Sequence, residues 1–165
     1  MNLPNLVTLL RLFAIPFIVI LLFNNVISPY WAMGLFLLVA VSDALDGWLA
    51  RKLNQVTDLG KFLDPIVDKA LIITVLLILA LQNNVLLAPA AILIGREIIV
   101  SVWRAFLAKK RIIVPAGKLG KLKMILEVIA VSMLIINLAG GLLVLWIAVV
   151  LSLLSAVEYL LNGLK

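Results

Sequence analysis

Six long apolar runs, separated by short polar joints, make up most of this chain. They cover residues 6–24, 31–50, 62–81, 86–108, 122–139 and 141–162. An α-helix needs roughly twenty residues to cross the hydrocarbon core of a bilayer, and each run has about that length. Only helices and closed barrels satisfy backbone groups in hydrocarbon, and the runs lack the alternation of barrel strands. The sequence therefore predicts an all-α integral membrane protein with six transmembrane helices.

The composition excludes a small soluble fold. Of the 165 residues 65% are hydrophobic, and the mean hydropathy is +1.27. One small core cannot cover that much apolar surface. The first run has no basic segment before it and no small-residue cleavage site, so we expect it to stay as a span. Because the joints are short, residues 1–165 are expected to form a single domain. No nucleic acid is expected as a partner.

Basic residues in the joints fall on one side of the predicted membrane protein. Ten of the fourteen lie between spans two and three, between spans four and five, or at the C-terminus, and the remaining joints have none. This distribution follows the positive-inside rule. It predicts a multi-pass protein of the cytoplasmic membrane with both termini in the cytoplasm. Glu158 and Tyr159, near the end of the last run, are expected to act as interfacial anchors.

A patterned group of aspartates joins the second run to the third. The pattern is Asp43-x2-Asp46-Gly47-x2-Ala50-Arg51-x8-Gly60-x3-Asp64-x3-Asp68. Spacings of three and four place the acids of each run on one helix face, and the small residues would permit close approach. Carboxylates near lipid are costly without a counter-charge, so intramembrane acids indicate function. The alternative is a solvated helix face with glycine and alanine used only for packing.

The aspartates suggest a metal site bound through oxygen. Histidine and cysteine are both absent from the chain, which excludes imidazole and thiolate ligands. Oxygen ligands favour hard divalent cations such as magnesium or manganese. Two such cations about 4 Å apart would suit the displacement of a phosphoryl group.

This spacing resembles the signature of the CDP-alcohol phosphatidyltransferase family, and every signature position is filled. The resemblance implies six transmembrane helices with an active-site cavity that faces the cytoplasm. It also implies transfer of the phosphatidyl group of a CDP-lipid, usually CDP-diacylglycerol, to an alcohol, with release of CMP. Members of the family are commonly homodimeric, so a homodimer among membrane lipids is expected.

The resemblance assigns roles to individual residues. The four aspartates would coordinate two divalent cations, Mg or Mn, and Asp68 would also act as the general base for the acceptor hydroxyl. Direct in-line attack is expected, and double displacement through an aspartate stays open. Asn5 and Thr8 are candidates for lining the nucleotide site, or alternatively for capping the first helix. The residues expected to bind the CDP-lipid are Asp43, Gly47, Ala50, Arg51, Gly60, Thr8 and Asn5.

A second group of basic residues lies in span four and at the start of span five. Its members are Arg96, Arg104, Lys118, Lys121 and Lys123. Guanidinium and ammonium groups bind phosphate well, so this group is expected to hold the phosphate of an anionic acceptor. The alternative for Arg96 is a buried pair with an acid such as Glu127. The basic run 109–111 is better explained by attraction to anionic lipid head groups.

Three further segments resemble the phosphatidylglycerophosphate synthase branch of that family. They are Met1–Arg11, Arg96–Arg104 and Ala116–Lys123. The resemblance implies glycerol 3-phosphate as the acceptor. Met124, where the branch usually has threonine, and Trp103, in place of a smaller apolar residue, depart from it. Inositol phosphate, serine and phosphatidylglycerol therefore stay open as acceptors.

Two other classes of protein are alternatives to an enzyme. A small divalent-cation transporter would use the acids as its ion pathway. However, the outer halves of spans two and three carry no charge, and Arg51 beside the acids suits phosphate better. A noncatalytic membrane scaffold leaves the aspartate spacing unexplained.

Overall fold

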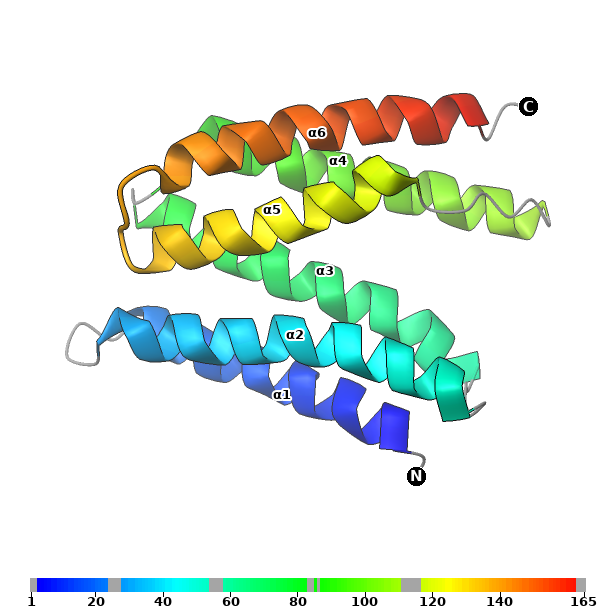
Figure 1. Ribbon diagram of the computed structural model, residues 1–165, viewed down its shortest axis with the longest axis horizontal. Coiled ribbons are helices and arrows are strands. Elements are labelled where there is room, and N and C mark those ends of the chain that lie inside the picture. Colours follow the sequence, from blue (N-terminus) through cyan, green and yellow to red (C-terminus); the bar gives the residue numbers. More distant parts are fainter. Residues whose placement is uncertain are drawn as a thin grey trace. The chain divides into compact units, whose positions relative to one another are not determined.

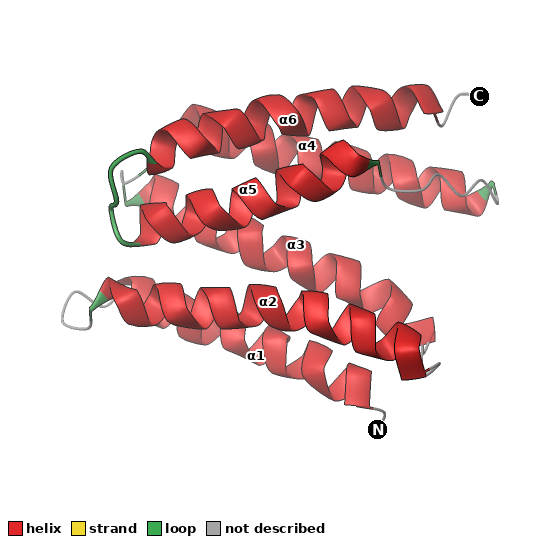
Figure 2. Ribbon diagram, in the orientation of Figure 1, coloured by secondary structure: helices red, strands yellow, loops and turns green. Residues whose placement is uncertain are grey.

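The computed structural model describes the backbone of residues 3–23, 28–53, 58–82, 85, 87–110 and 117–162. Within this part it describes the side chains of 12–23, 28–42, 69–82, 85, 87–107, 110, 117 and 119–161. The helices in chain order (Figure 1) are α1 (Leu3–Phe23), α2 (Pro29–Leu53), α3 (Asp58–Leu81), α4 (Leu87–Lys109), α5 (Lys118–Ile135) and α6 (Gly141–Asn162). All regular structure in the described part is helical (Figure 2), which confirms an all-α protein there.

In the described residues the helices follow the predicted spans in order, and several of them extend past the apolar runs. Helix α2 ends at Leu53, three residues after its predicted span, and α3 begins at Asp58, four residues before its own. These extensions contain polar and charged residues. The whole aspartate pattern except the joint at 54–57 consequently lies on helical backbone.

Helix α5 ends at Ile135, four residues before the end of the predicted span. The stop is made by Asn137, whose φ of 52° lies in the left-handed region. The N–H of Leu138 donates to the carbonyl of Met133 at 2.8 Å, and the N–H of Asn137 donates to Leu134 at 3.1 Å. These two bonds form a Schellman motif, in which asparagine is the usual substitute for glycine.

Two glycines complete the turn from α5 to α6. Gly140 has a φ of 92°, a conformation that residues with a side chain rarely adopt. A Cβ on Gly141 would lie 3.2 Å from side-chain atoms of both Leu134 and Met133. The two helices therefore approach closely where the hairpin closes.

The chain divides into two compact units, Met1–Leu79 and Ala80–Lys165. In the first unit α1 packs against α2. In the second unit α6 packs against both α5 and α4. The expectation of a single domain stays a prediction.

Helix α6 separates a buried stripe from an exposed apolar face. The buried residues recur at intervals of three and four, as expected for one side of a helix; they are Leu145, Ala148, Val149, Ser152, Ser155, Ala156 and Tyr159. The exposed face is also apolar, with residues that include Leu143, Val150, Leu154 and Val157. A soluble monomer rarely exposes such a continuous apolar face, so this surface suits contact with lipid.

Helix α6 is also the clearest membrane span. In the described residues, its segment Gly141–Leu161 is the one stretch that is both long enough and apolar enough to cross a bilayer. Shorter apolar stretches are described in α1, α2 and α3, covering Leu12–Phe23, Pro29–Ser42 and Lys69–Leu81. The structure is thus that of a helical protein consistent with membrane embedding, and six spans stay a prediction.

Candidate active site

The aspartate pattern occupies two successive helices of the first unit. Asp43, Asp46, Gly47, Ala50 and Arg51 lie on α2, and Gly60, Asp64 and Asp68 lie on α3. Asn5 and Thr8 lie near the beginning of α1. The side chains at all of these positions lie outside the described part, so their roles stay predictions.

Helix geometry places the aspartates at matching levels. With a rise of 1.5 Å per residue, position 43 is about 15 Å before the end of α2, and position 68 is about 15 Å after the start of α3. Positions 46 and 64 are each about 10 Å from the same helix ends. Figure 1 shows that the end of α2, the start of α3 and the start of α1 lie at one end of the first unit.

The donor set at these positions suits a hard cation. It consists of carboxylates alone, and the chain contains no histidine or cysteine. Magnesium and manganese prefer oxygen ligands of this kind. Among the side chains that the structure does describe, no group of three acidic residues is placed to hold a metal ion. The aspartate pattern is therefore the candidate metal centre.

A cluster of charged side chains is buried inside the second unit. This charge cluster consists of Arg96 and Glu97 on α4 with Lys123 and Glu127 on α5. Arg96 Nη1 lies 2.6 Å from Glu97 Oε1, and Lys123 Nζ donates to that same oxygen. Lys123 Nζ also lies 3.0 Å from Glu127 Oε1. One carboxylate oxygen thus joins cations from two helices.

Arg96 extends the charge cluster to α6. Its Nε donates to the carbonyl of Ser152 at 3.0 Å, and its Nη2 donates to Ser155 Oγ at 3.2 Å. The hydroxyl of Ser152 is buried and has no hydrogen-bond partner among the described residues. Arg96 therefore connects α4 with α6 through two hydrogen bonds.

Burial makes these ion pairs energetically important. The side chains are 10% exposed in Arg96, 11% in Glu97, 7% in Lys123 and 2% in Glu127. The cluster brings two basic and two acidic side chains together, so each buried basic group has an acid beside it. Removing one member of a buried pair typically costs about 3–5 kcal/mol, because the other charge is left uncompensated.

Helix register explains why charges occupy the interior. Glu97 falls in the same buried stripe of α4 as Leu93 and Val100. Lys123 and Glu127 are one turn apart on α5 and begin its buried stripe. Because these positions face neighbouring helices, a charge on one helix needs an opposite charge on the next. Glu97 of α4 and Lys123 of α5 meet this need for each other.

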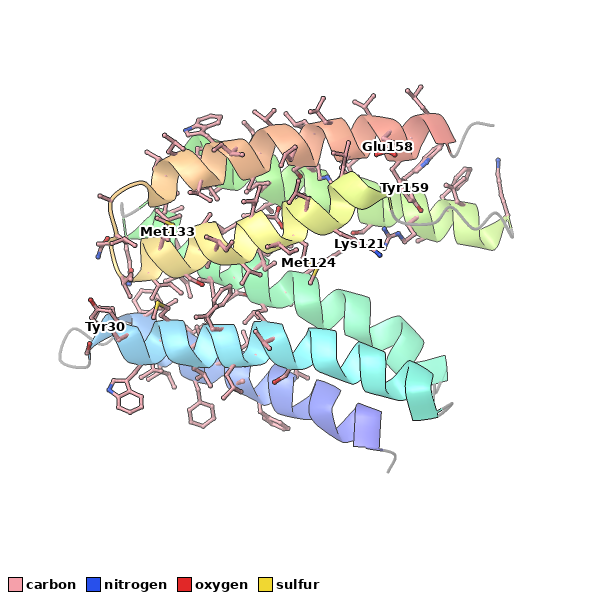
Figure 3. The ribbon with its side chains drawn as sticks, viewed as in Figure 1. Tyr30, Lys121, Met124, Met133, Glu158 and Tyr159 are labelled. Atoms are coloured by element: carbon pink, nitrogen blue, oxygen red, sulfur yellow. The ribbon has the colours of Figure 1, made fainter. Side chains whose placement is uncertain are left out.

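The other predicted acceptor residues stay outside the charge cluster. The guanidinium carbon of Arg104 lies 5.3 Å from the centroid of the Tyr159 ring, a cation–π contact. Lys121 is exposed on α5, at the same end of the second unit as Glu158 and Tyr159 (Figure 3). Lys118 begins α5, and its side chain lies outside the described part.

Small residues bring the start of α5 close to α6. A Cβ on Gly117 would lie 3.0 Å from both carboxylate oxygens of Glu158. A Cβ on Gly120 would lie 3.3 Å from Ser155 Oγ. The carboxylate of Glu158 is consequently near the N-terminus of α5, where the helix dipole favours a negative charge.

Sequence reasoning missed several of these contacts. The alternative reading of Arg96, a buried pair with an acid, is confirmed, but the acid that it contacts is its neighbour Glu97, and Glu127 contacts Lys123. One feature of the sequence could have indicated that Glu97 is buried: it lies four residues after Leu93 and three before Val100, in the apolar stripe of α4. Tyr159 is buried and packs in a cluster with residues such as Val100, and its role as an interfacial anchor stays a prediction.

The chain is similar over most of its length to members of one known enzyme family. The profile of the CDP-alcohol phosphatidyltransferase family matches residues 1–154. The chain is 38% identical over 168 residues to the CDP-diacylglycerol--glycerol-3-phosphate 3-phosphatidyltransferase of Rickettsia typhi (strain ATCC VR-144 / Wilmington), covering 96% of this chain and 94% of the relative. It is 36% identical over 170 residues to the protein of the same name from Escherichia coli (strain K12), with 96% and 93% covered.

Proposed function

Because the chain belongs to the CDP-alcohol phosphatidyltransferase family, we propose that it transfers the phosphatidyl group of CDP-diacylglycerol to glycerol 3-phosphate. The products are phosphatidylglycerophosphate and CMP. The observation that carries this proposal is the complete aspartate pattern, with its acids at matching levels on α2 and α3. The names of the full-length relatives supply the acceptor.

In the proposed reaction the acceptor hydroxyl attacks the phosphorus that bears the lipid. A new P–O bond forms to glycerol 3-phosphate, and the P–O bond to CMP breaks in line with it. The carboxylate of Asp68 accepts the hydroxyl proton, since the chain has no histidine for this task. Two divalent cations, Mg or Mn, would supply the positive charge that stabilises the pyrophosphate during displacement.

The remaining pattern residues bind the CDP-lipid in this proposal. Asp43, Asp46 and Asp64 provide carboxylate oxygens together with Asp68. Arg51 donates to the pyrophosphate, for which a guanidinium is well suited. The small residues Gly47, Ala50 and Gly60 leave room for the nucleotide, and Asn5 and Thr8 line its site from α1.

The acceptor phosphate is bound by basic residues of the second unit. These are Arg96, Arg104, Lys118, Lys121 and Lys123. Support comes from the donor inventory of Arg96, which has five N–H donors and uses three of them within the described contacts. Two donors are left for a ligand. Lys123 lies beside it in the charge cluster and adds a second cation.

We place this reaction at the cytoplasmic face of a bacterial membrane. All six helices then span the bilayer, both termini lie in the cytoplasm, and the active-site cavity opens on that side. The distribution of basic residues supports this orientation. The exposed apolar face of α6 supports lipid contact, and a homodimer is the proposed assembly.

An assay with a panel of acceptors tests the proposed function. Purified protein in mixed micelles is given labelled CDP-diacylglycerol with glycerol 3-phosphate, inositol phosphate, serine or phosphatidylglycerol. Release of CMP is expected with glycerol 3-phosphate and labelled phosphatidylglycerophosphate is the expected product. Turnover confined to another acceptor would reject the proposed substrate. Metal flux in liposomes without any CMP release would reject the enzyme class.

A further inference from the structure

The carboxylate of Glu97 lies between Arg96 and Lys123, two residues that are proposed to bind the acceptor phosphate. Its Oε1 accepts from Arg96 on the same helix and from Lys123 on α5. Since both nitrogens contact one oxygen, they lie within about 5 Å of each other. Glu127 also contacts Lys123, with Nζ at 3.0 Å from its Oε1.

Two cations this close repel one another strongly when they are buried. Water cannot screen them, and the three helices around them are apolar along most of their buried stripes. Without an anion between them, the two side chains would move apart. Glu97 therefore keeps Arg96 and Lys123 adjacent.

We propose that Glu97 is a positioning residue for the acceptor, which holds Arg96 and Lys123 together as a preformed pair for the acceptor's phosphate. This inference rests on the proposed function and names the residue that organises its acceptor site. Arg96 keeps its geometry through Ser152 and Ser155 on one side and Glu97 on the other. A ligand phosphate then meets two cations whose arrangement needs no further ordering.

A rival explanation is that Glu97 competes with the acceptor phosphate, and it predicts the opposite change in KM. A glutamate that merely occupied the place of the phosphate would compete with the acceptor. Its removal would then lower the KM for glycerol 3-phosphate. A positioning role predicts the reverse, because loss of the charge disperses the pair that binds phosphate.

Steady-state kinetics of Glu97→Gln and Glu97→Asp test the proposal. Glu97→Gln is expected to raise the KM for glycerol 3-phosphate at least tenfold, with the KM for CDP-diacylglycerol unchanged and kcat reduced less than threefold. Glu97→Asp keeps the carboxylate and should recover part of the affinity. An unchanged or lowered KM for glycerol 3-phosphate in Glu97→Gln overturns the proposal, as does an equal loss of affinity for both substrates.

Glu158→Gln is the matched control, since it removes a glutamate from the same unit outside the charge cluster. It should leave both KM values as in the wild type. Gel filtration and thermal unfolding in detergent show whether each variant is folded. If Glu97→Gln fails to fold, Glu97→Asp decides the matter: a raised KM for glycerol 3-phosphate alone supports positioning, and a lowered KM or an equal rise for both substrates overturns it.

A double-mutant cycle measures whether the effect of Glu97 on the KM for glycerol 3-phosphate depends on Arg96, which a purely structural role does not predict. In an Arg96→Ala background, Glu97→Gln should change the KM for glycerol 3-phosphate much less than it does in the wild type. Strictly additive effects would overturn the proposal. Failure of the wild type itself to use glycerol 3-phosphate would instead reject the proposed function, so the two failures are distinguishable.

Discussion

Glu97 on α4 and Lys123 on α5 form a buried ion pair across 26 residues of sequence. The pair lies inside three packed helices, where isolated charges are costly. Arg96 contacts the same carboxylate of Glu97, and Glu127 contacts Lys123. Acidic and basic side chains are therefore buried together at one level of this unit.

Asp68→Asn should abolish CMP release while leaving a folded protein. The change keeps the volume of the side chain and removes its ability to accept the hydroxyl proton, so kcat is expected to fall by roughly 10²–10⁴. Asp58→Asn is the control, because it makes the same substitution on the same helix outside the pattern. Near-normal turnover of Asp68→Asn would exclude it as the base.

Chelation should stop the reaction reversibly. The candidate metal centre contains only carboxylates, so EDTA is expected to remove its cations and activity together. Adding Mg or Mn should restore CMP release, and Asp64→Asn should need a higher metal concentration for half of its maximal rate. Full activity after exhaustive chelation would contradict a metal-dependent mechanism.

Arg96→Ala should weaken the acceptor far more than the CDP-lipid. Loss of a charged hydrogen-bond donor is expected to raise the KM for glycerol 3-phosphate by roughly 10- to 100-fold. Lys110→Ala is a suitable comparison, since Lys110 is exposed and lies 4.5 Å over the Phe106 ring, away from the charge cluster. Equal KM values in the two variants would return Arg96 to a structural role.

Asn137→Ala should destabilise the α5–α6 hairpin. Asn137 is exposed and has a φ of 52°, so the substitution removes no packing but forces alanine into a strained conformation. The expected cost is about 1 kcal/mol, visible as a lower Tm in detergent. Asn137→Gly should retain the wild-type Tm. A fall in Tm for glycine as large as that for alanine would contradict the proposed role of backbone strain.

Single cysteines test the membrane orientation on a chain that has none of its own. Ser28 and Lys110 are both exposed and lie in joints that the positive-inside rule assigns to opposite faces. An impermeant maleimide should label Ser28→Cys in intact spheroplasts. Lys110→Cys should react only after permeabilisation. The reverse pattern would invert the proposed topology.

Periodicity and length were sufficient to predict the helices. In the described part of the chain each apolar run coincides with a helix, as expected for apolar stretches of about twenty residues. The exact ends were harder to predict. Asn137 stops α5 through a left-handed conformation, and the polar ends of α2 and α3 stay helical although hydropathy falls there.

The candidate site also has one part that the sequence predicts and one part that depends on how the helices pack. The aspartate spacing predicted a shared level on two helices, because register follows directly from residue number. The charge cluster could not be predicted in detail, since the partner of Arg96 depends on how α4, α5 and α6 pack. Ser152 and Ser155 carry no signal in a sequence until Arg96 is seen to reach them.

The Schellman turn between α5 and α6 has a consequence for biogenesis. Because the two helices are joined so tightly, they would enter the bilayer as one hairpin during translation. The lysine and glutamate of α5 would be shielded by α6 and matched by the arginine and glutamate of α4, which is synthesised earlier. We therefore expect variants that loosen this turn to accumulate less in the membrane, even where the purified protein works normally.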